Sequence, residues 1–299
     1  MALRRLGLAA ALAVALAPVA LGQPKRRIYV SADMEGVAGV VTGDQLSPQG
    51  FEYERFRGFM TDEVLAAIEG ARAAGATEFL VSDSHGNGEN LLIERLPKDV
   101  QVVRSWPRPL AMMQGIDGSF EAVIFVGYHA STTNPEGVRA HTMSSAHLAD
   151  LRLNGVSVPE AGLNAAIAGH FGVPVAMVTG DDAIVKEAQA LLGPVAGAVV
   201  KWNYGFHSAR TLTPQASCDL IRETARKALS ERRYGKPYAL SAPVTLDLRF
   251  KNYRPAEVLA YLPIVERTDA HAIRFRGKDI LEVSRFLEFV DEYEPGLAP

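Results

Sequence analysis

Two carboxylates, Asp33 and Glu35, follow directly on a short strand-like segment, residues 27–32. In an extended chain, side chains two residues apart point to the same side, so these carboxylates are expected a few ångströms apart. Two anions held so close repel each other unless one is protonated or a cation lies between them. Gly36 and Gly39 allow the backbone to turn tightly past this point. The pair is therefore interpreted as half of a metal site.

Other side chains that can bind metals follow further apolar segments of the chain. They are His85 after residues 78–82, His129 after residues 122–126, and Asp181 with Asp182 after residues 173–178. The carboxyl ends of parallel strands form the ligand crevice of an open α/β sheet, so these groups converge if the strands are neighbours. Glu160, at the start of a predicted helix, can point into the same crevice.

The combined set favours a particular metal chemistry. Imidazoles and carboxylates without a thiolate suit zinc, manganese or cobalt. Asp33, Glu35, His85, His129 and Glu160 are more ligands than one closed tetrahedral zinc site uses. Two metal ions that share a bridging carboxylate fit this set. Such a pair, about 3.5–4 Å apart, can hold a hydroxide and polarise a carbonyl at the same time.

Each residue also has an interpretation without chemistry. Asp33 alone can cap a turn, and Glu160 can simply favour the positive end of its helix. His85 stands in a loop-like sequence, and His129 after an apolar run can be a buried core histidine. The metal interpretation depends on the coincidence that three strand ends supply a pair of carboxylates, a histidine and another histidine.

The segments between these residues predict the fold. Strands are expected at 27–32, 78–82, 100–103, 122–126, 173–178 and 196–200, and helices at 52–74, at 160–168 and up to 192. Strand and helix in alternation are the βαβ signature, which predicts an α/β fold with a largely parallel sheet flanked by helices. Asn154-Gly155 within residues 151–158 predicts a hairpin.

The pattern changes near Lys201. A helix at 214–233, strands at 244–250 and 272–275, and helices at 255–262 and 278–289 predict a smaller C-terminal α+β segment. The predicted division is an α/β metal-binding catalytic domain over residues 26–200 and a smaller α+β domain over residues 201–293.

The N-terminus predicts export. Two arginines precede an apolar run, residues 6–16, and small residues follow at Ala20 and Gly22. These features describe a secretory signal over residues 1–22, which directs the protein to the periplasm or out of the cell. The run is too short and too rich in alanine for a convincing membrane anchor. An uncleaved anchor or a mis-assigned start is the alternative.

Composition excludes some classes of function. The chain has 299 residues, of which 48% are apolar, and a net charge of -3, so it can build a sizeable core. The charge gives no electrostatic case for binding nucleic acid or an anionic membrane. Cys218 is the single cysteine, so an exported chain has no internal disulfide and relies on its core or a metal.

Six motifs occur in order over residues 27–186. They are Ser-Ala-Asp-Met-Glu-Gly (31–36), Ser-Asp-Ser-His (82–85), Gly-Tyr-His-Ala (127–130), Ala-His-Thr-Met (140–143), Glu-Ala-Gly-Leu-Asn (160–164) and Gly-Asp-Asp (180–182). As a set, they make the chain resemble the D-aminopeptidases of the DppA type, peptidase family M55.

The resemblance implies two zinc ions per chain and a ring-like homo-oligomer. It also implies release of N-terminal D-amino acids from short peptides such as D-Ala-D-Ala. By the same resemblance, His141 would be the catalytic histidine, as nucleophile or proton carrier. Asp33 would bridge the two metals, and the other ligands would be Glu35, His85, His129 and Glu160.

The resulting hypothesis is an exported, dizinc, D-stereospecific aminopeptidase. Asp181 or Asp182 is the candidate partner for the free amine of the substrate. Two alternatives stay open: a dinuclear amidohydrolase or phosphoesterase acting on another small molecule, and a non-catalytic periplasmic binding protein. The chain has no glycine-rich phosphate loop followed by lysine, which counts against phosphate substrates.

Overall fold

The computed structural model describes residues 25–232 and 234–293, so the predicted signal over residues 1–22 lies outside the described residues. The strands are β1 (Arg27–Ala32), β2 (Glu78–Asp83), β3 (Val100–Val103), β4 (Ala122–Tyr128), β5 (Leu148–Leu153), β6 (Val156–Ser157), β7 (Val175–Asp181), β8 (Ala196–Gly205), β9 (Ser208–Thr211), β10 (Val244–Phe250), β11 (Val265–Asp269) and β12 (Ala272–Gly277). The α-helices are α1 (Tyr53–Ala73), α2 (Glu160–His170), α3 (Asp182–Leu192), α4 (Pro214–Glu231), α5 (Tyr253–Leu259) and α6 (Ile280–Glu292). Three short 3₁₀ helices are η1 (Gly43–Gln45), η2 (Ile93–Arg95) and η3 (Ala111–Met113).

The larger sheet has seven strands in the order β3-β2-β1-β4-β7-β8-β9. All neighbouring strands are parallel except β9, which runs antiparallel to β8. From β1 the chain moves outward through β2 and β3, then returns to the other side of β1 as β4. The carboxyl ends of β1 and β4 therefore meet where the strand order reverses, which is where open α/β sheets bind ligands.

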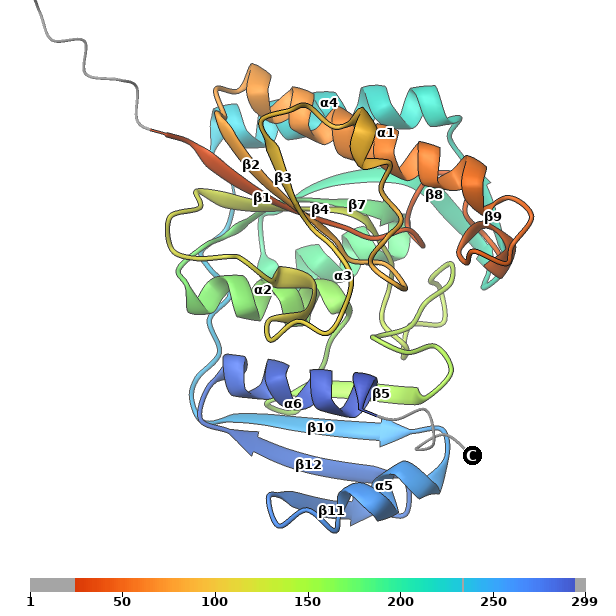
Figure 1. Cartoon of the computed structure of the whole chain (residues 1–299), viewed down its shortest axis with the longest axis vertical. Helices are drawn as coiled ribbons and strands as arrows, with labels where there is room; N and C mark the ends of the chain where they lie inside the picture. The colour runs from red at the N-terminus through yellow and green to blue at the C-terminus, as the bar shows by residue number, and fades with distance from the viewer. Residues whose placement is uncertain (1–24, 233, 294–299) are drawn as a thin grey trace, which may run out of the picture.

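Helices cover both faces of this sheet, with α1 packed against α4 on one face and α2 with α3 on the other (Figure 1). Successive residues of β1 explain why both faces are apolar. Ile28 and Val30 enter the core under α1 and α4, whereas Tyr29 enters the core on the opposite face. A strand covered on both sides reads as a continuous apolar run, as β1 and β4 do. The predicted α/β fold is confirmed.

The smaller sheet has five strands in the order β11-β12-β10-β5-β6, and its neighbouring strands are antiparallel. The predicted hairpin at Asn154-Gly155 is confirmed, and both turn residues have positive φ, 47° and 84°. Helix α6 lies between this sheet and α2 (Figure 1). One continuous apolar cluster contains Tyr29 of the larger sheet and Leu246 of the smaller one, so the two sheets share a core.

The chain does not divide between the two sheets near residue 200. Strands β5 and β6 precede that point but belong to the smaller sheet, whereas α4 follows it and packs against α1. Leu151 and Leu153 of β5 pair with Leu248 and Leu246 of β10, which buries the apolar face of the hairpin. The hydrophobic periodicity of the sequence predicts which face of a strand is apolar, but not which strand it pairs with. Within the described residues, no helix is both long and apolar enough to cross a bilayer.

Candidate metal centre

The five predicted ligands come together at the carboxyl edge of the larger sheet. Asp33 directly follows β1, His129 directly follows β4, and His85 lies two residues beyond the end of β2. These three strands are neighbours in the sheet. Glu35 lies in the turn after Asp33, and Glu160 is the first residue of α2. All five side chains are buried, with at most 7% of any residue exposed.

Two glycines allow the ends of β1 and β4 to approach closely. The amide of Gly36 donates to the carbonyl of Gly127 over 2.7 Å. A Cβ on Gly36 would collide with the Tyr128 carbonyl, and one on Gly127 would collide with the Asp33 carbonyl. Gly127 also has a φ of 71°, which side chains rarely adopt. This contact brings Asp33 within reach of the histidine that follows β4.

Asp33 lies between two pairs, each made of one imidazole and one carboxylate. His85 Nδ1 is 2.9 Å from Glu35 Oε2 and 3.2 Å from Asp33 Oδ1. His129 Nε2 is 3.2 Å from Asp33 Oδ2 and 3.4 Å from Glu160 Oε2. The two oxygens of Asp33 therefore face different imidazoles, which is the geometry expected of a carboxylate shared by two cations.

Each histidine of the cluster has one ring nitrogen fixed by a backbone carbonyl. The contacts are His85 Nε2 to Leu46 O (2.8 Å), His129 Nδ1 to Ala130 O (3.2 Å) and His141 Nδ1 to Arg139 O (2.8 Å). A carbonyl can only accept, so in the neutral ring the fixed nitrogen carries the proton and the other presents its lone pair. Metal-binding histidines are typically oriented in this way.

The donor atoms of the cluster fit a divalent cation. Asp33 Oδ2, Glu35 Oε2 and His129 Nε2 are buried, yet they form no hydrogen bond of acceptable geometry within the described residues. Buried polar atoms without partners are costly, and a cation between them would satisfy all three. Oxygen and nitrogen donors without a thiolate suit zinc, manganese or cobalt. The residues present therefore fit the metal that the sequence predicts.

The carboxylates and imidazoles also change one another's pKa. Burial lowers the pKa of His85 and His129, but the adjacent carboxylates outweigh it and raise both pKa values well above the usual value. Burial, with the charge of Glu35, raises the pKa of Asp33. For Glu35, burial is outweighed by the histidines, chiefly His85, and its pKa falls well below the usual value. Protons on the imidazoles thus occupy positions that a metal must take, so metal binding releases protons.

His141 lies at the edge of this cluster. Its ring stacks on that of His129, with centroids 4.0 Å apart and planes 10° apart. Its Nε2 is 3.8 Å from Glu160 Oε1. Burial and the neighbouring His129 lower the pKa of His141, so it is a neutral imidazole at neutral pH. Donor atoms of His129, His141 and Glu160 lie within 4.8 Å of one another, as do those of Asp33, Glu35 and His129.

Asp181 and Asp182 do not join the cluster. Asp181 Oδ1 accepts from the Ile184 amide (2.9 Å) and Oδ2 from the Val138 amide (2.6 Å), so it caps α3 and holds a loop. Asp182 accepts from the Asn203 amide and contacts a lysine of its own helix. Asp181 is therefore a helix cap, and both carboxylates accept hydrogen bonds from backbone amides outside the cluster, which does not support either as the partner of a substrate amine.

Sequence reasoning missed a lysine that holds the turn after β1. Lys201 is completely buried, and its ammonium donates to the carbonyls of Glu35, Val37 (3.2 Å) and Val40 (2.7 Å). Burial lowers the pKa of Lys201 to about 8, although the charge of Asp181 opposes the shift. A single lysine at the end of an apolar run carries no local signal of this role.

Buried imidazoles and carboxylates gathered at the point of strand reversal define a candidate metal-binding site in an α/β protein. A family model for peptidase M55, described as D-aminopeptidase, matches residues 26–289, and the chain belongs to this family. The D-aminopeptidase of Bacillus subtilis (strain 168) is 35% identical over 257 residues, which are 86% of this chain and 93% of that protein.

A solved structure is also similar to this one. The Zn-dependent D-aminopeptidase DppA from Bacillus subtilis, described as a self-compartmentalizing protease, matches with a TM-score of 0.86 and 34% identity, over 89% of this chain and 97% of that one. The predicted family and fold are therefore confirmed, and the protein is placed among the enzymes that hydrolyse peptide bonds.

Proposed function

We propose that this protein is a zinc-dependent, D-stereospecific aminopeptidase that releases N-terminal D-amino acids from short peptides such as D-Ala-D-Ala. The observation that carries the proposal is Asp33, whose two oxygens face the Glu35–His85 pair and the His129–Glu160 pair. Membership of the D-aminopeptidase family and the zinc dependence of the similar solved protein support it.

The geometry favours two ions per chain. Glu35 and His85 would hold one ion, His129 and Glu160 the other, and Asp33 would bind both. When bound, zinc supplies a Lewis acid toward the peptide carbonyl. The protein contributes a buried site with little access for bulk water, in which such polarisation is stronger.

His141 is assigned the transfer of a proton or the nucleophilic attack. The Arg139 carbonyl fixes its Nδ1 and the ring of His129 fixes its plane, so Nε2 is presented toward Glu160 and the centre. Because its pKa is lowered, Nε2 is free to take a proton at neutral pH and to return it to the leaving amine.

Export and assembly complete the proposal. Residues 1–22 have the pattern of a secretory signal, and a periplasmic or secreted enzyme would meet short peptides that contain D-residues. A homo-oligomeric ring is supported by the similar solved protein, which is described as self-compartmentalizing. The mature N-terminus and the mass of the assembly test these two points directly.

The function is tested with purified mature protein, D-Ala-p-nitroanilide and its L isomer. We expect release of p-nitroaniline from the D isomer only, its loss after chelation, and its return with zinc, with two zinc ions per chain by elemental analysis. Bound metal without release from any D-substrate would favour the alternative, a dinuclear amidohydrolase acting on another small molecule. Release that resists chelation would contradict the metal assignment.

A further inference from the structure

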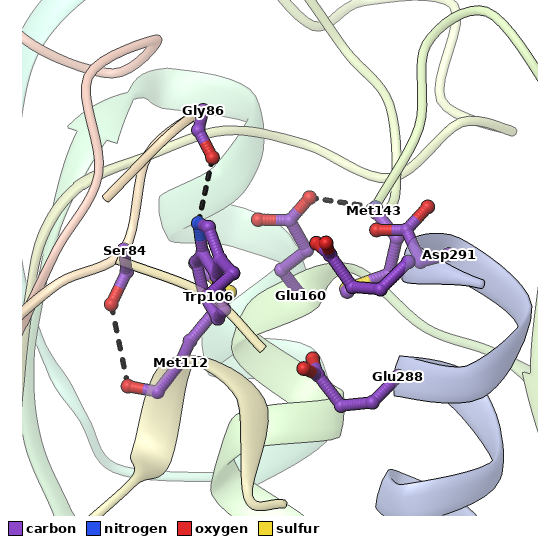
Figure 2. A pocket seen from close by; sticks show the side chains of 9 residues that line it. Ser84, Gly86, Trp106, Met112, Met143, Glu160, Glu288 and Asp291 are labelled. Carbon is purple, nitrogen blue, oxygen red and sulfur yellow. Dashed lines mark hydrogen bonds between the residues drawn. The ribbon is translucent and has the colours of Figure 1, made fainter. Parts of the chain in front are cut away.

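A pocket opens beside the metal centre, between the segment around Trp106, η3 and the last turns of α6 (Figure 2). Its cavity volume is about 100 Å³, and its mouth is open to solvent. Glu160 belongs both to the metal cluster and to the wall of this pocket. A substrate whose scissile carbonyl lies at the cluster therefore has this pocket within reach of its N-terminal residue.

The wall supplied by α6 is acidic. Glu288, Asp291 and Glu292 all line the pocket, and their spacing of three and four residues places them on one side of the helix. Asp291 and Glu292 are exposed at the mouth, whereas Glu288 is only 7% exposed. Within residues 25–232 and 234–293, none of the three forms an ion pair with a lysine, arginine or histidine.

Glu288 is the buried group that points to a ligand. Its Oε2 accepts from the backbone amide of Arg108 over 2.8 Å, and its Oε1 forms no hydrogen bond within the described residues. The guanidinium of Arg108 bonds instead to Ser82 Oγ and the Asp83 carbonyl. Figure 2 shows the Glu288 carboxylate turned from α6 toward the side of the pocket that Trp106 and Met112 form.

Burial is unfavourable for a carboxylate that forms no ion pair, and burial, with the charges of Glu292 and Asp291, raises the pKa of Glu288 to about 7. The opposite wall is apolar, because Trp106, Met112 and Met143 line it. The guanidinium of Arg108 covers one face of the Trp106 ring, 3.9 Å from its centroid. The pocket thus combines an apolar wall with a carboxylate that forms no ion pair, although the charge of Arg108 partly opposes the rise of its pKa. A side chain with an apolar stem and a cationic end matches both.

We propose that this pocket receives the side chain of the substrate's N-terminal residue and selects D-residues with a cationic side chain, such as D-lysine. The proposal rests on the proposed D-aminopeptidase function and specifies its substrate. The methylene stem would pack on Trp106, Met112 and Met143, and the ammonium would donate to Glu288 Oε1. Asp291 and Glu292 at the mouth would attract the cation as it enters.

The test compares three substrates of the zinc-loaded, full-length mature enzyme: the p-nitroanilides of D-lysine, D-norleucine and D-alanine. D-Norleucine keeps the stem of D-lysine without the charge, so the ratio of their kcat/KM values isolates the ammonium. We expect D-lysine to exceed D-norleucine by roughly tenfold or more, since a charge-assisted hydrogen bond is worth that factor. A ratio of one or less in the wild-type enzyme would overturn the proposal.

Glu288→Gln keeps an acceptor for the Arg108 amide but removes the charge. We expect it to bring the ratio of D-lysine to D-norleucine close to one while D-norleucine turnover persists. An equal loss on all three substrates would assign Glu288 to the α-ammonium group that they share, and would overturn side-chain selection. The control Glu94→Gln changes an exposed glutamate of η2 outside the pocket and should leave the ratio unchanged.

Folding does not limit the test. If Glu288→Gln fails to fold, the double variant Asp291→Asn/Glu292→Gln provides a second test, because it alters only exposed positions. It should lower the ratio of the kcat/KM values for D-lysine and D-norleucine p-nitroanilides at low ionic strength. An unchanged ratio there would count against the proposal. The same experiment distinguishes failure of the proposed function from failure of the pocket assignment. No release of p-nitroaniline from any D-substrate contradicts the aminopeptidase function. Release without a preference for D-lysine contradicts only the pocket assignment.

Discussion

Asp33 is the residue on which the proposed metal centre depends, because its two oxygens face different imidazoles. Asp33→Ala is therefore expected to lose both ions, whereas Glu160→Gln, which alters one pair, should lose mainly one. Elemental analysis after gel filtration in metal-free buffer gives the zinc content per chain. Two zinc ions retained by Asp33→Ala would contradict the shared-carboxylate arrangement, and Glu94→Gln serves as the exposed control.

His141 stacks on a proposed ligand but is also within reach of Glu160, so metal content and turnover must be measured together. As the catalytic histidine, His141→Ala should keep the zinc content of the wild type and lower kcat by about 10²-fold or more, the usual contribution of a positioned proton carrier. Loss of one zinc ion in this variant would instead identify His141 as a ligand.

The sequence could predict that the proposed ligands meet because most of them stand at or just beyond a strand end or at a helix start, where position along the chain determines position in the sheet. Asp33, His85 and His129 are such residues. Glu288 and Lys201 could not be predicted in this way. Glu288 approaches the centre only through the packing of α6, and Lys201 acts on carbonyls 161 to 166 residues earlier in the chain.

At the level of elements, strands and helices were largely predictable and their partners were not. The apolar runs of β1, β4 and β7 exist because helices cover both faces of the larger sheet, and such runs are visible in the sequence. The alternation of β5 is equally visible, but it is compatible with either sheet. Its pairing with β10, about 90 residues later, depends on tertiary packing, which periodicity does not encode.

Glu63 connects α1, α4 and the turn after β1, and it predicts a pH dependence of stability. From α1, its Oε1 accepts from the Ala38 amide (3.0 Å) and from the Ser217 hydroxyl of α4 (2.6 Å). Burial raises its pKa from the ordinary 4.5 to about 7, although these hydrogen bonds oppose the shift. Between these two pH values the folded state binds more protons, so the free energy of unfolding falls as pH rises through the window.

Glu63→Gln removes this titration, and the wild type should therefore lose about 3 kcal/mol relative to the variant between pH 4.5 and pH 8. Urea unfolding of the zinc-loaded proteins at several pH values measures the difference, in which the titration of the metal centre cancels. Parallel stability curves for the two proteins would contradict a raised pKa. The amide of the variant adds an offset, but this offset does not depend on pH.

At the scale of the whole molecule, the two sheets are parts of one folding unit. A single apolar cluster runs from Tyr29 and Val178 of the larger sheet to Leu246 and Phe275 of the smaller one. Helix α6, packed between the smaller sheet and α2, places Glu288 beside the metal centre. Substrate selection by this helix would thus depend on the packing of the smaller sheet against the larger one.

The shared core predicts that the chain unfolds in a single thermal transition. Zinc binding is expected to raise the midpoint temperature of that transition. The proposed metal centre joins the ends of β1, β2 and β4 to α2, and without metal its carboxylates are buried without full compensation. At a free zinc concentration about 1,000-fold above Kd, binding contributes about 4 kcal/mol to stability. Scanning calorimetry should therefore show a single peak that chelation moves down by several degrees and zinc restores. Asp33→Ala, which cannot share a cation, should show no shift with zinc; two separate peaks in the wild type would contradict the common core.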